Sequence, residues 1–321
     1  MKDVVNCIGD KGKISTKALR DYISDNIRNR DLILKFKKSD VMFLDTDIAY
    51  LAKLADENAS YVKGLVNYII KEEDLSCDSL DALCKIINSV SEFNFKLQNL
   101  YELDNIRAGK HFRLVNINIS DFMRSFYKSV NSYLPVRNCK NIGYVDTIRK
   151  DTFCNINLNL VTHILMNFIS NAIKHSKSKD ERIDIVLNRL NKGNYAAISV
   201  IDYGVGVDLD KIYEAVRLAA RESSVGSMRK FRGYGLYVCQ VLADKLGGSI
   251  LVTNMKGGGA VFTLILEAKD APAVNGIINV SDVESVRNKQ HEKLIETAMS
   301  QFRNDAEYLM RKGLINNDNN I

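Results

Sequence analysis

Two asparagines stand four residues apart in the stretch NFISNAIKHS, residues 167–176, whose remaining side chains predict a buried helix. Asparagine is a mediocre helix former because its side-chain amide competes for nearby backbone groups. An apolar helix therefore has no structural use for Asn167 and Asn171 on one side. The pair indicates either a capping role or contact with a polar ligand.

A second polar group follows an expected strand, where the stretch DYGVGV covers residues 202–207. Gly204 and Gly206 allow a tight turn and a close backbone approach to a ligand. Asp202 would place a carboxylate in the pocket that this turn lines. Because a carboxylate accepts hydrogen bonds from an exocyclic amine, the segment suits an adenine.

A third segment, RGYGL, brings Gly233, Gly235 and Leu236 to the start of an expected helix. Free backbone amides at a helix N-terminus bind phosphate, helped by the helix dipole. The segment before it supplies three cations that we expect to close over nucleotide phosphates: Arg229, Lys230 and Arg232. Each pattern alone is also typical of a simple turn, but their order along the chain favours a nucleotide site.

Alternating apolar residues predict two β-hairpins around these segments. The first joins RIDIVLNRL to YAAISVIDYG through the turn NKGN, and the second joins SILVTN to AVFTLILE through MKGGG. Helical patterns cover residues 119–133, 158–176 and 235–246, and two glycines end the last of them. Helices combined with a largely antiparallel sheet predict an α+β class, with an α/β sandwich over residues 111–270.

Residues 41–110 follow a helical pattern throughout. In the second expected helix, apolar residues recur three and four apart, as in a coiled coil. They are Leu80, Leu83, Ile87, Val90, Phe93, Leu97, Leu100 and Leu103. The polar stretch KEEDLSCDS separates this helix from a first one between Asp45 and Ile70, which predicts an antiparallel hairpin. Because two helices leave such a stripe exposed, we expect a homodimer that buries it in a four-helix bundle.

The two ends of the chain carry shorter helical patterns. Residues 1–40 include KGKISTKALRDYISDNIRNRD, whose basic amphipathic pattern leaves a DNA-linked regulatory role open. Residues 271–321 form an expected helical tail, in which Ser281 and Glu284 match a capping box. An apolar stripe follows, made of Ile295, Met299, Phe302 and Leu309.

Composition favours a cytoplasmic protein. The 321 residues contain no signal-peptide pattern and no apolar run near the ~20 residues of a membrane helix, so we expect no membrane insertion. Six scattered cysteines without a CxxC pair indicate reduced thiols. The net charge of +6 is interspersed with acidic residues, which disfavours nucleic acid as a partner.

The series NFISNAIKHS, DYGVGV, RGYGL and MKGGGAVFTLIL resembles, in order and spacing, the ATP-binding domain of histidine kinases. The superfamily to which this ATP-binding domain belongs also contains gyrase-type ATPases. The likeness covers residues 111–268, and LQNLYELDNIRAGKHFRL resembles the junction with the family's helical bundle, which extends it upstream to residue 45. The resemblance implies a dimerisation and phosphotransfer bundle in residues 41–110. It also implies a two-component partner, either a response regulator or a partner kinase.

By this resemblance the chain binds ATP and Mg²⁺. Asn167 and Asn171 would face the triphosphate, and the amide oxygen of Asn171 would be the Mg²⁺ ligand, which suits a hard cation that keeps several waters. Lys174 would reach a phosphate. His163, one turn before Asn167, would orient an attacking group.

The first helix of the hairpin departs from the family pattern. Histidine kinases carry a phosphoacceptor histidine there, whereas the four histidines of this chain stand at 111, 163, 175 and 291. The acceptor position falls in LADENASYV near Asp56, and a carboxylate does not replace an imidazole nitrogen. His291, in QHEKLIET, echoes an acceptor sequence. Two interpretations stay open: a kinase that phosphorylates an unusual residue or a partner, and an inactive pseudokinase scaffold.

Overall fold

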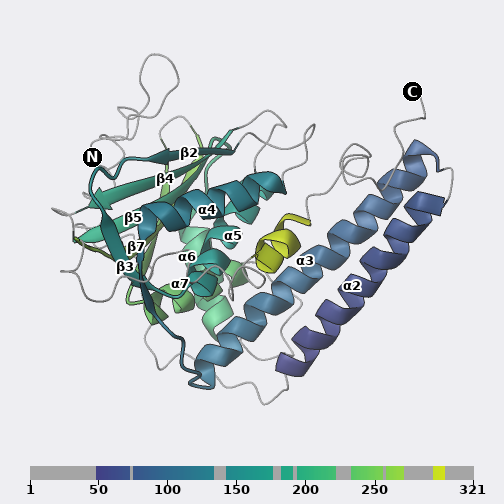
Figure 1. The fold of residues 1–321 in the computed structure, drawn as a ribbon, viewed down its shortest axis with the longest axis horizontal. Coiled ribbons are helices and arrows are strands. Elements are labelled where there is room, and N and C mark those ends of the chain that lie inside the picture. Colours follow the sequence, from purple (N-terminus) through teal and green to yellow (C-terminus); the bar gives the residue numbers. More distant parts are fainter. Residues whose placement is uncertain are drawn as a thin grey trace.

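The computed structural model describes residues 48–72, 75–133, 142–175, 182–190, 194–221, 233–255, 258–270 and 292–300. Within them, a long helical hairpin precedes a domain of helices and sheets (Figure 1). The predicted α+β class and the order of hairpin and sandwich are confirmed. No helix in these ranges is long and apolar enough to cross a bilayer. The expected N-terminal helices, the capping box at Ser281 and His291 lie outside the described residues.

The hairpin consists of α2 (Ile48–Glu72) and α3 (Cys77–Arg107). Ser76 caps α3, because its side-chain oxygen accepts a hydrogen bond from the Ser79 backbone N–H at 3.2 Å. A small apolar cluster joins the two helices near their turn, and it contains Val66, Ile70, Cys84 and Ile87. The pairing of the helices therefore agrees with the sequence prediction.

One member of the predicted stripe on α3 is on the outside, since Phe93 is 59% exposed. The reason is a change of partner along the helix. The turn-proximal half of α3 packs on α2, whereas the other half also packs on the α/β domain. Its buried side chains there include Asn94, Phe95 and Asn99, which are not on the predicted stripe.

Five strands form the large sheet. Their order is β2 (Ile142–Asp146), β4 (Ile183–Leu190), β5 (Tyr195–Asp202), β7 (Ala260–Glu267) and β6 (Ser249–Asn254). The predicted hairpins are the antiparallel pairs β4–β5 and β6–β7. β2 adds a parallel edge that the sequence pattern did not reveal. A small second sheet contains β1 (Val115–Asn118), β3 (Thr152–Ile156) and β8 (Lys269–Asp270).

Four helices lie together on one face of the large sheet (Figure 1). They are α4 (Ile119–Ser132), α5 (Leu158–His175), α6 (Leu209–Arg221) and α7 (Tyr234–Lys245). Their apolar sides and this sheet face form the main core, in which the ring centroids of Phe168 and Phe262 are 5.6 Å apart. A separate apolar cluster on the sheet includes Val186, Ile201 and Val261.

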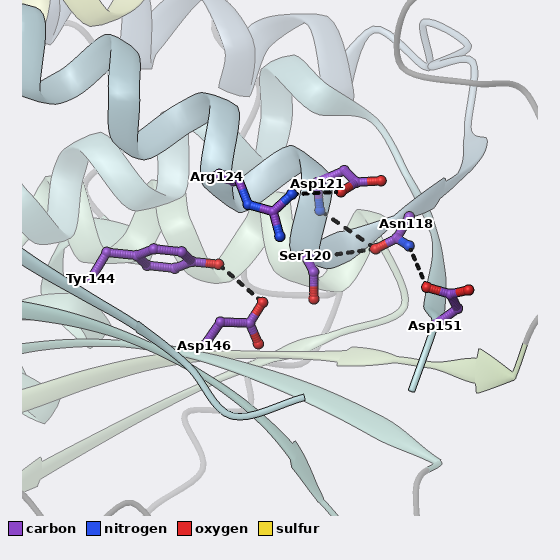
Figure 2. A network of polar contacts seen from close by, with 7 residues as sticks. All are labelled: Asn118, Ser120, Asp121, Arg124, Tyr144, Asp146 and Asp151. Atoms are coloured by element: carbon purple, nitrogen blue, oxygen red, sulfur yellow. Dashed lines mark hydrogen bonds and ion pairs between the residues drawn. The ribbon is translucent and has the colours of Figure 1, made fainter. Parts of the chain in front are cut away.

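Asparagines begin two of these helices. The Asn118 side-chain oxygen accepts a hydrogen bond from the Ser120 backbone N–H at 3.0 Å, while its amide nitrogen donates to Asp151 at 3.2 Å (Figure 2). The Asn157 side-chain oxygen accepts from the Leu160 backbone N–H at 3.1 Å at the start of α5. Because such caps fix where a helix begins, they also fix which residues of α5 face the neighbouring helices.

Residues 292–300 form a short helix beside α3, drawn in yellow in Figure 1. Four of its side chains join the main core: Leu294, Ile295, Ala298 and Met299. Lys293 forms an ion pair with Asp56 of α2. The expected tail helix therefore contacts both the hairpin and the α/β domain.

Candidate functional site

The two asparagines of α5 have different surroundings. Asn167 is buried and fully engaged, since its amide nitrogen donates to Asn99 of α3 and to the backbone oxygen of His163, both at 2.9 Å. Its oxygen accepts a hydrogen bond from the Asn99 amide at 3.1 Å. Asn171 is half-buried, and in the described part of the chain its amide makes no hydrogen bond. Asn171 therefore keeps an amide oxygen that a ligand can use.

Asp202 lies at the end of β5, where its carboxylate is buried. One oxygen accepts hydrogen bonds from the backbone N–H groups of Gly204 at 3.0 Å and of Ala260 at 3.2 Å. Because Ala260 begins β7, this carboxylate joins the turn after β5 to the second hairpin. Backbone donors fix the carboxylate in one orientation, as a residue that reads an exocyclic amine requires.

Glycines bring these two turns together. Gly259 has φ +101°, and a Cβ there would lie 2.3 Å from the Asp202 backbone oxygen. Gly206 has φ +78°, and a Cβ there would lie 2.9 Å from the side-chain oxygen of Asn254. The sequence predicted a close approach of Gly204 and Gly206 to a ligand, and what the structure shows is a close approach of Gly206 to Asn254 and Gly259 of the second hairpin.

Asn254 was missed by the sequence analysis. Its side-chain oxygen accepts from the Val207 backbone N–H at 2.7 Å, and its amide nitrogen donates to the Val207 backbone oxygen at 2.6 Å. These two bonds hold the DYGVGV segment against the end of β6. An asparagine that ends an otherwise apolar strand, directly before a glycine turn, was the available signal.

The start of α7 packs between two other helices. Gly233 has φ +81°, and a Cβ there would lie 2.7 Å from the backbone carbonyl carbon of Ala215 on α6. A Cβ on Gly235 would lie 2.8 Å from the side-chain oxygen of Asn167. The start of α7 therefore meets the asparagine helix. Leu236 packs in the main core.

Lys174 and His163 both contact α3. The Lys174 ammonium donates to Glu92 at 2.9 Å, and His163 is buried with its Nε2 3.6 Å from a carboxylate oxygen of Glu102. Burial raises the pKa of Glu102, but the polar contact and charge of His163, together with Asn105 and Lys110, lower it by more, so this pKa lies below its ordinary value of 4.5.

The α3 partners Glu92, Asn99 and Glu102 were not predicted. Polar residues inside an apolar helical stripe were the only local sign of them. Three predicted phosphate-binding residues, Arg229, Lys230 and Arg232, lie outside the described residues.

Asn171 is the residue of α5 whose side-chain oxygen could hold a cation. Within the described ranges, no three His, Cys, Asp or Glu side chains cluster as a metal site would require. The amide oxygen of Asn171 fits Mg²⁺ that takes most of its ligands from phosphates and water. The arrangement can therefore hold an amine on the Asp202 side and an anion with its cation at α5 and α7.

Parts of the chain are similar to known proteins. Residues 157–270 match the family described as "Histidine kinase-, DNA gyrase B-, and HSP90-like ATPase". The autoinducer 2 sensor kinase/phosphatase LuxQ of Vibrio harveyi is 25% identical over 252 residues, which are 72% of this chain and 28% of LuxQ. The histidine protein kinase SaeS of Staphylococcus epidermidis is 26% identical over 218 residues, 65% of this chain and 58% of SaeS.

Among solved structures, full-length ShkA in complex with AMPPNP aligns with a TM-score of 0.48 and 19% identity, over 71% of this chain and 47% of ShkA. The chain spans little more than a quarter of the length of LuxQ and under two thirds of SaeS.

Proposed function

The chain carries an ATPase domain of the histidine kinase family, and we propose that it binds Mg-ATP and transfers phosphate in a two-component signalling system. The observation that carries this proposal is the Asp202 carboxylate, buried and held by two backbone amides where the two glycine turns meet. Because a carboxylate accepts hydrogen bonds from an exocyclic amine, adenine is the base that this position fits.

The phosphate end of the proposed site is assigned to α5 and α7. Asn171 would offer an amide oxygen to Mg²⁺, and the backbone amides at the start of α7 would face the phosphates. Lys174 would bind a phosphate oxygen, with Arg229, Lys230 and Arg232 as further candidates. His163 would orient an attacking group through α5. Bound Mg²⁺ would neutralise charge on the triphosphate, so the protein's part is positioning.

A second candidate is favoured by the surroundings of Asp56, the residue nearest the expected acceptor position. One carboxylate oxygen accepts a hydrogen bond from the Asn94 amide at 3.2 Å, and the other pairs with Lys293. Both oxygens are therefore engaged, which does not suit a phosphate acceptor. This supports a nucleotide-regulated pseudokinase that docks a response regulator or partner kinase through a homodimeric bundle. A DNA-linked role for residues 1–40 stays a prediction outside the described residues.

Calorimetry of the full chain with ATP, in the presence and absence of Mg²⁺, tests the binding step. Saturable binding that Mg²⁺ strengthens is the expected result. The same protein is then incubated with γ-labelled ATP, alone and with candidate response regulators. Stable label on the chain or on a regulator supports phosphotransfer, and binding without label supports the scaffold. Absence of binding at millimolar nucleotide overturns both.

A further inference from the structure

A row of polar side chains on α3 meets the residues of α5 that the proposed function assigns to nucleotide. The row consists of three pairs: Glu92 with Lys174, Asn99 with Asn167, and Glu102 with His163. The residue numbers rise along α3 while they fall along α5, so the two helices run antiparallel in a single register. The row therefore covers about three turns of α5 from one side.

The asparagine pair is the buried centre of this row, where Asn99 is 3% and Asn167 is 5% exposed. Each amide donates to the oxygen of the other, at 2.9 and 3.1 Å. The backbone oxygen of His163 accepts a further bond from the Asn167 amide at 2.9 Å. Both N–H groups of Asn167 are thus engaged by protein. A phosphate oxygen cannot receive either of them unless a bond to Asn99 or to α5 itself is broken.

Lys174 is held by a negative charge from the hairpin. The Glu92 carboxylate lies 2.9 Å from Lys174 and 3.0 Å from Lys96. Partial burial raises the pKa of Glu92, but the two ammonium groups lower this pKa by more than burial raises it, so the carboxylate stays ionised. A triphosphate that approaches Lys174 would compete with this carboxylate and be repelled by it.

We propose that α3 gates the nucleotide site. The row holds Asn167 and Lys174 on the hairpin, and triphosphate binding requires them to exchange α3 for phosphate. This inference rests on the proposed function, since it assumes that the site takes a nucleotide. Phe95 and Leu103 lie in the main core and keep the hairpin attached, so the gate opens by loss of the polar pairs of the row, which gives the backbone around them more freedom.

A gate of this kind is reciprocal. If α3 competes with the triphosphate, weakening the row tightens nucleotide binding, and nucleotide binding weakens the row by the same factor. The first effect appears in the dissociation constant and the second in amide hydrogen exchange of α3. A row that merely stabilised the fold would change neither in this linked way.

Glu92→Gln and Asn99→Ala are the test variants, with Asp81→Asn as the matched control. Asp81 forms a 2.6 Å ion pair with Lys85 on the exposed, turn-proximal part of α3, away from α5. The affinity of the full chain for a non-hydrolysable ATP analogue with Mg²⁺ is measured by calorimetry. We expect Glu92→Gln and Asn99→Ala to bind about fivefold more tightly or better, and Asp81→Asn to match the wild type. In the wild type, the analogue should accelerate exchange in residues 92–102.

Each other outcome has a distinct meaning. Equal affinity of all four proteins overturns the gate while the proposed function stands. Weaker binding by Glu92→Gln also overturns it, and makes α3 a supporting wall of the site. Glu92 forms a partly exposed pair, so this variant keeps the test informative even if Asn99→Ala unfolds. Absence of binding by every variant, with the fold intact by circular dichroism, removes the proposed function and the gate together.

Discussion

The ATPase domain and the helical hairpin bury their apolar residues to different degrees. In the ATPase domain, β4, β5, β6 and β7 are buried along almost their whole length. The hairpin, by contrast, exposes six large apolar side chains among those that the structure describes, which are Tyr61, Leu65, Tyr68, Ile69, Ile86 and Phe93. Four of these follow one another on α2 at helical spacing.

The contrast indicates where each part obtains its stability. The strands of the ATPase domain bury their apolar side chains by contacts within the chain, whereas the hairpin packs on the ATPase domain at one end and leaves apolar side chains of α2 exposed. Exposed apolar side chains that gather on one helix face are typical of an interaction site. This agrees with the predicted homodimer, in which a second copy would cover the α2 face.

The largest expected effect on stability comes from replacing a glycine of the ATPase domain. Gly259→Ala adds a Cβ 2.3 Å from the Asp202 backbone oxygen at φ +101°. We expect a loss of about 3 kcal/mol in the free energy of unfolding, from backbone strain and displacement of the turn. Nucleotide binding should be lost with it. Urea unfolding and calorimetry measure both.

Gly247→Ala is its control, because Gly247 has φ +69° but nothing within 4 Å of the added Cβ. This variant carries the strain without the clash. If Gly259→Ala lowered the free energy of unfolding no more than Gly247→Ala, the close contact between the two glycine turns would contribute nothing to stability. The contrast between the ATPase domain and the hairpin would then be smaller than the buried strands indicate.

Asp202→Asn separates binding from folding inside the ATPase domain. Asparagine keeps an oxygen for the backbone amides of Gly204 and Ala260 but removes the negative charge. We expect ATP affinity to fall about tenfold or more, the value of a hydrogen bond to a charged group, with the domain still folded. Asp184→Asn is the control: this buried carboxylate accepts from the Tyr203 hydroxyl at 2.7 Å, and its loss should reduce stability without changing ATP affinity. The opposite pattern would contradict the assignment of Asp202.

Glu102→Gln probes the contact between the two regions through its pH dependence. Because the folded-state pKa of Glu102 lies below 4.5, its carboxylate contributes stability that is fully present above pH 4.5 and is lost as pH falls through the lower folded value. We expect the variant to lose about 1–2 kcal/mol at pH 7 and to converge with the wild type in acid. Unfolding curves at several pH values measure this.

An exposed pair supplies the comparison for that series. Glu57 lies 3.8 Å from Lys53, with 63% of its side chain exposed. Glu57→Gln should therefore track the wild type at every pH. If the stability of Glu102→Gln and of Glu57→Gln depended on pH in the same way, the buried pair of Glu102 and His163 would contribute no stability to the contact between the hairpin and the ATPase domain.

The smallest effect on monomer stability is expected at the hairpin surface. Leu65→Glu places a charge on the apolar face of α2, where Leu65 is 45% exposed. We expect the free energy of unfolding to change by about 0.5 kcal/mol or less while a dimer is converted to monomer. Leu218→Glu, at a leucine on α6 that is 41% exposed, should leave the mass unchanged. Light scattering measures the molecular mass of each variant in solution. Equal masses for both variants would contradict the predicted dimeric bundle.

Local patterns were sufficient for the parts of the fold whose partners are close in sequence. The strands β6 and β7 have the predicted bounds residue for residue, since a hairpin is specified by its own alternation and its turn. The α5 helix and the turn at Asp202 followed from residue types for the same reason. The comparisons confirm the histidine kinase type of ATPase domain.

Contacts between distant segments could not be predicted in this way. Asn99 and Asn167 are 68 residues apart, and nothing in either local pattern names the other. Phe93 matched the stripe but is exposed, because packing on the ATPase domain changes which side of α3 is buried. The edge strand β2 was missed because its neighbour β4 lies beyond β3 and α5 in the chain.

That parallel edge has a kinetic consequence. A short turn joins β6 to β7, whereas β2 can pair with β4 only after the intervening β3 and α5 have been placed. Long closures of this kind are slow to form. During refolding, amide protection should therefore appear at the β6 border early and at the β2 border late, so the sheet closes from one margin to the other.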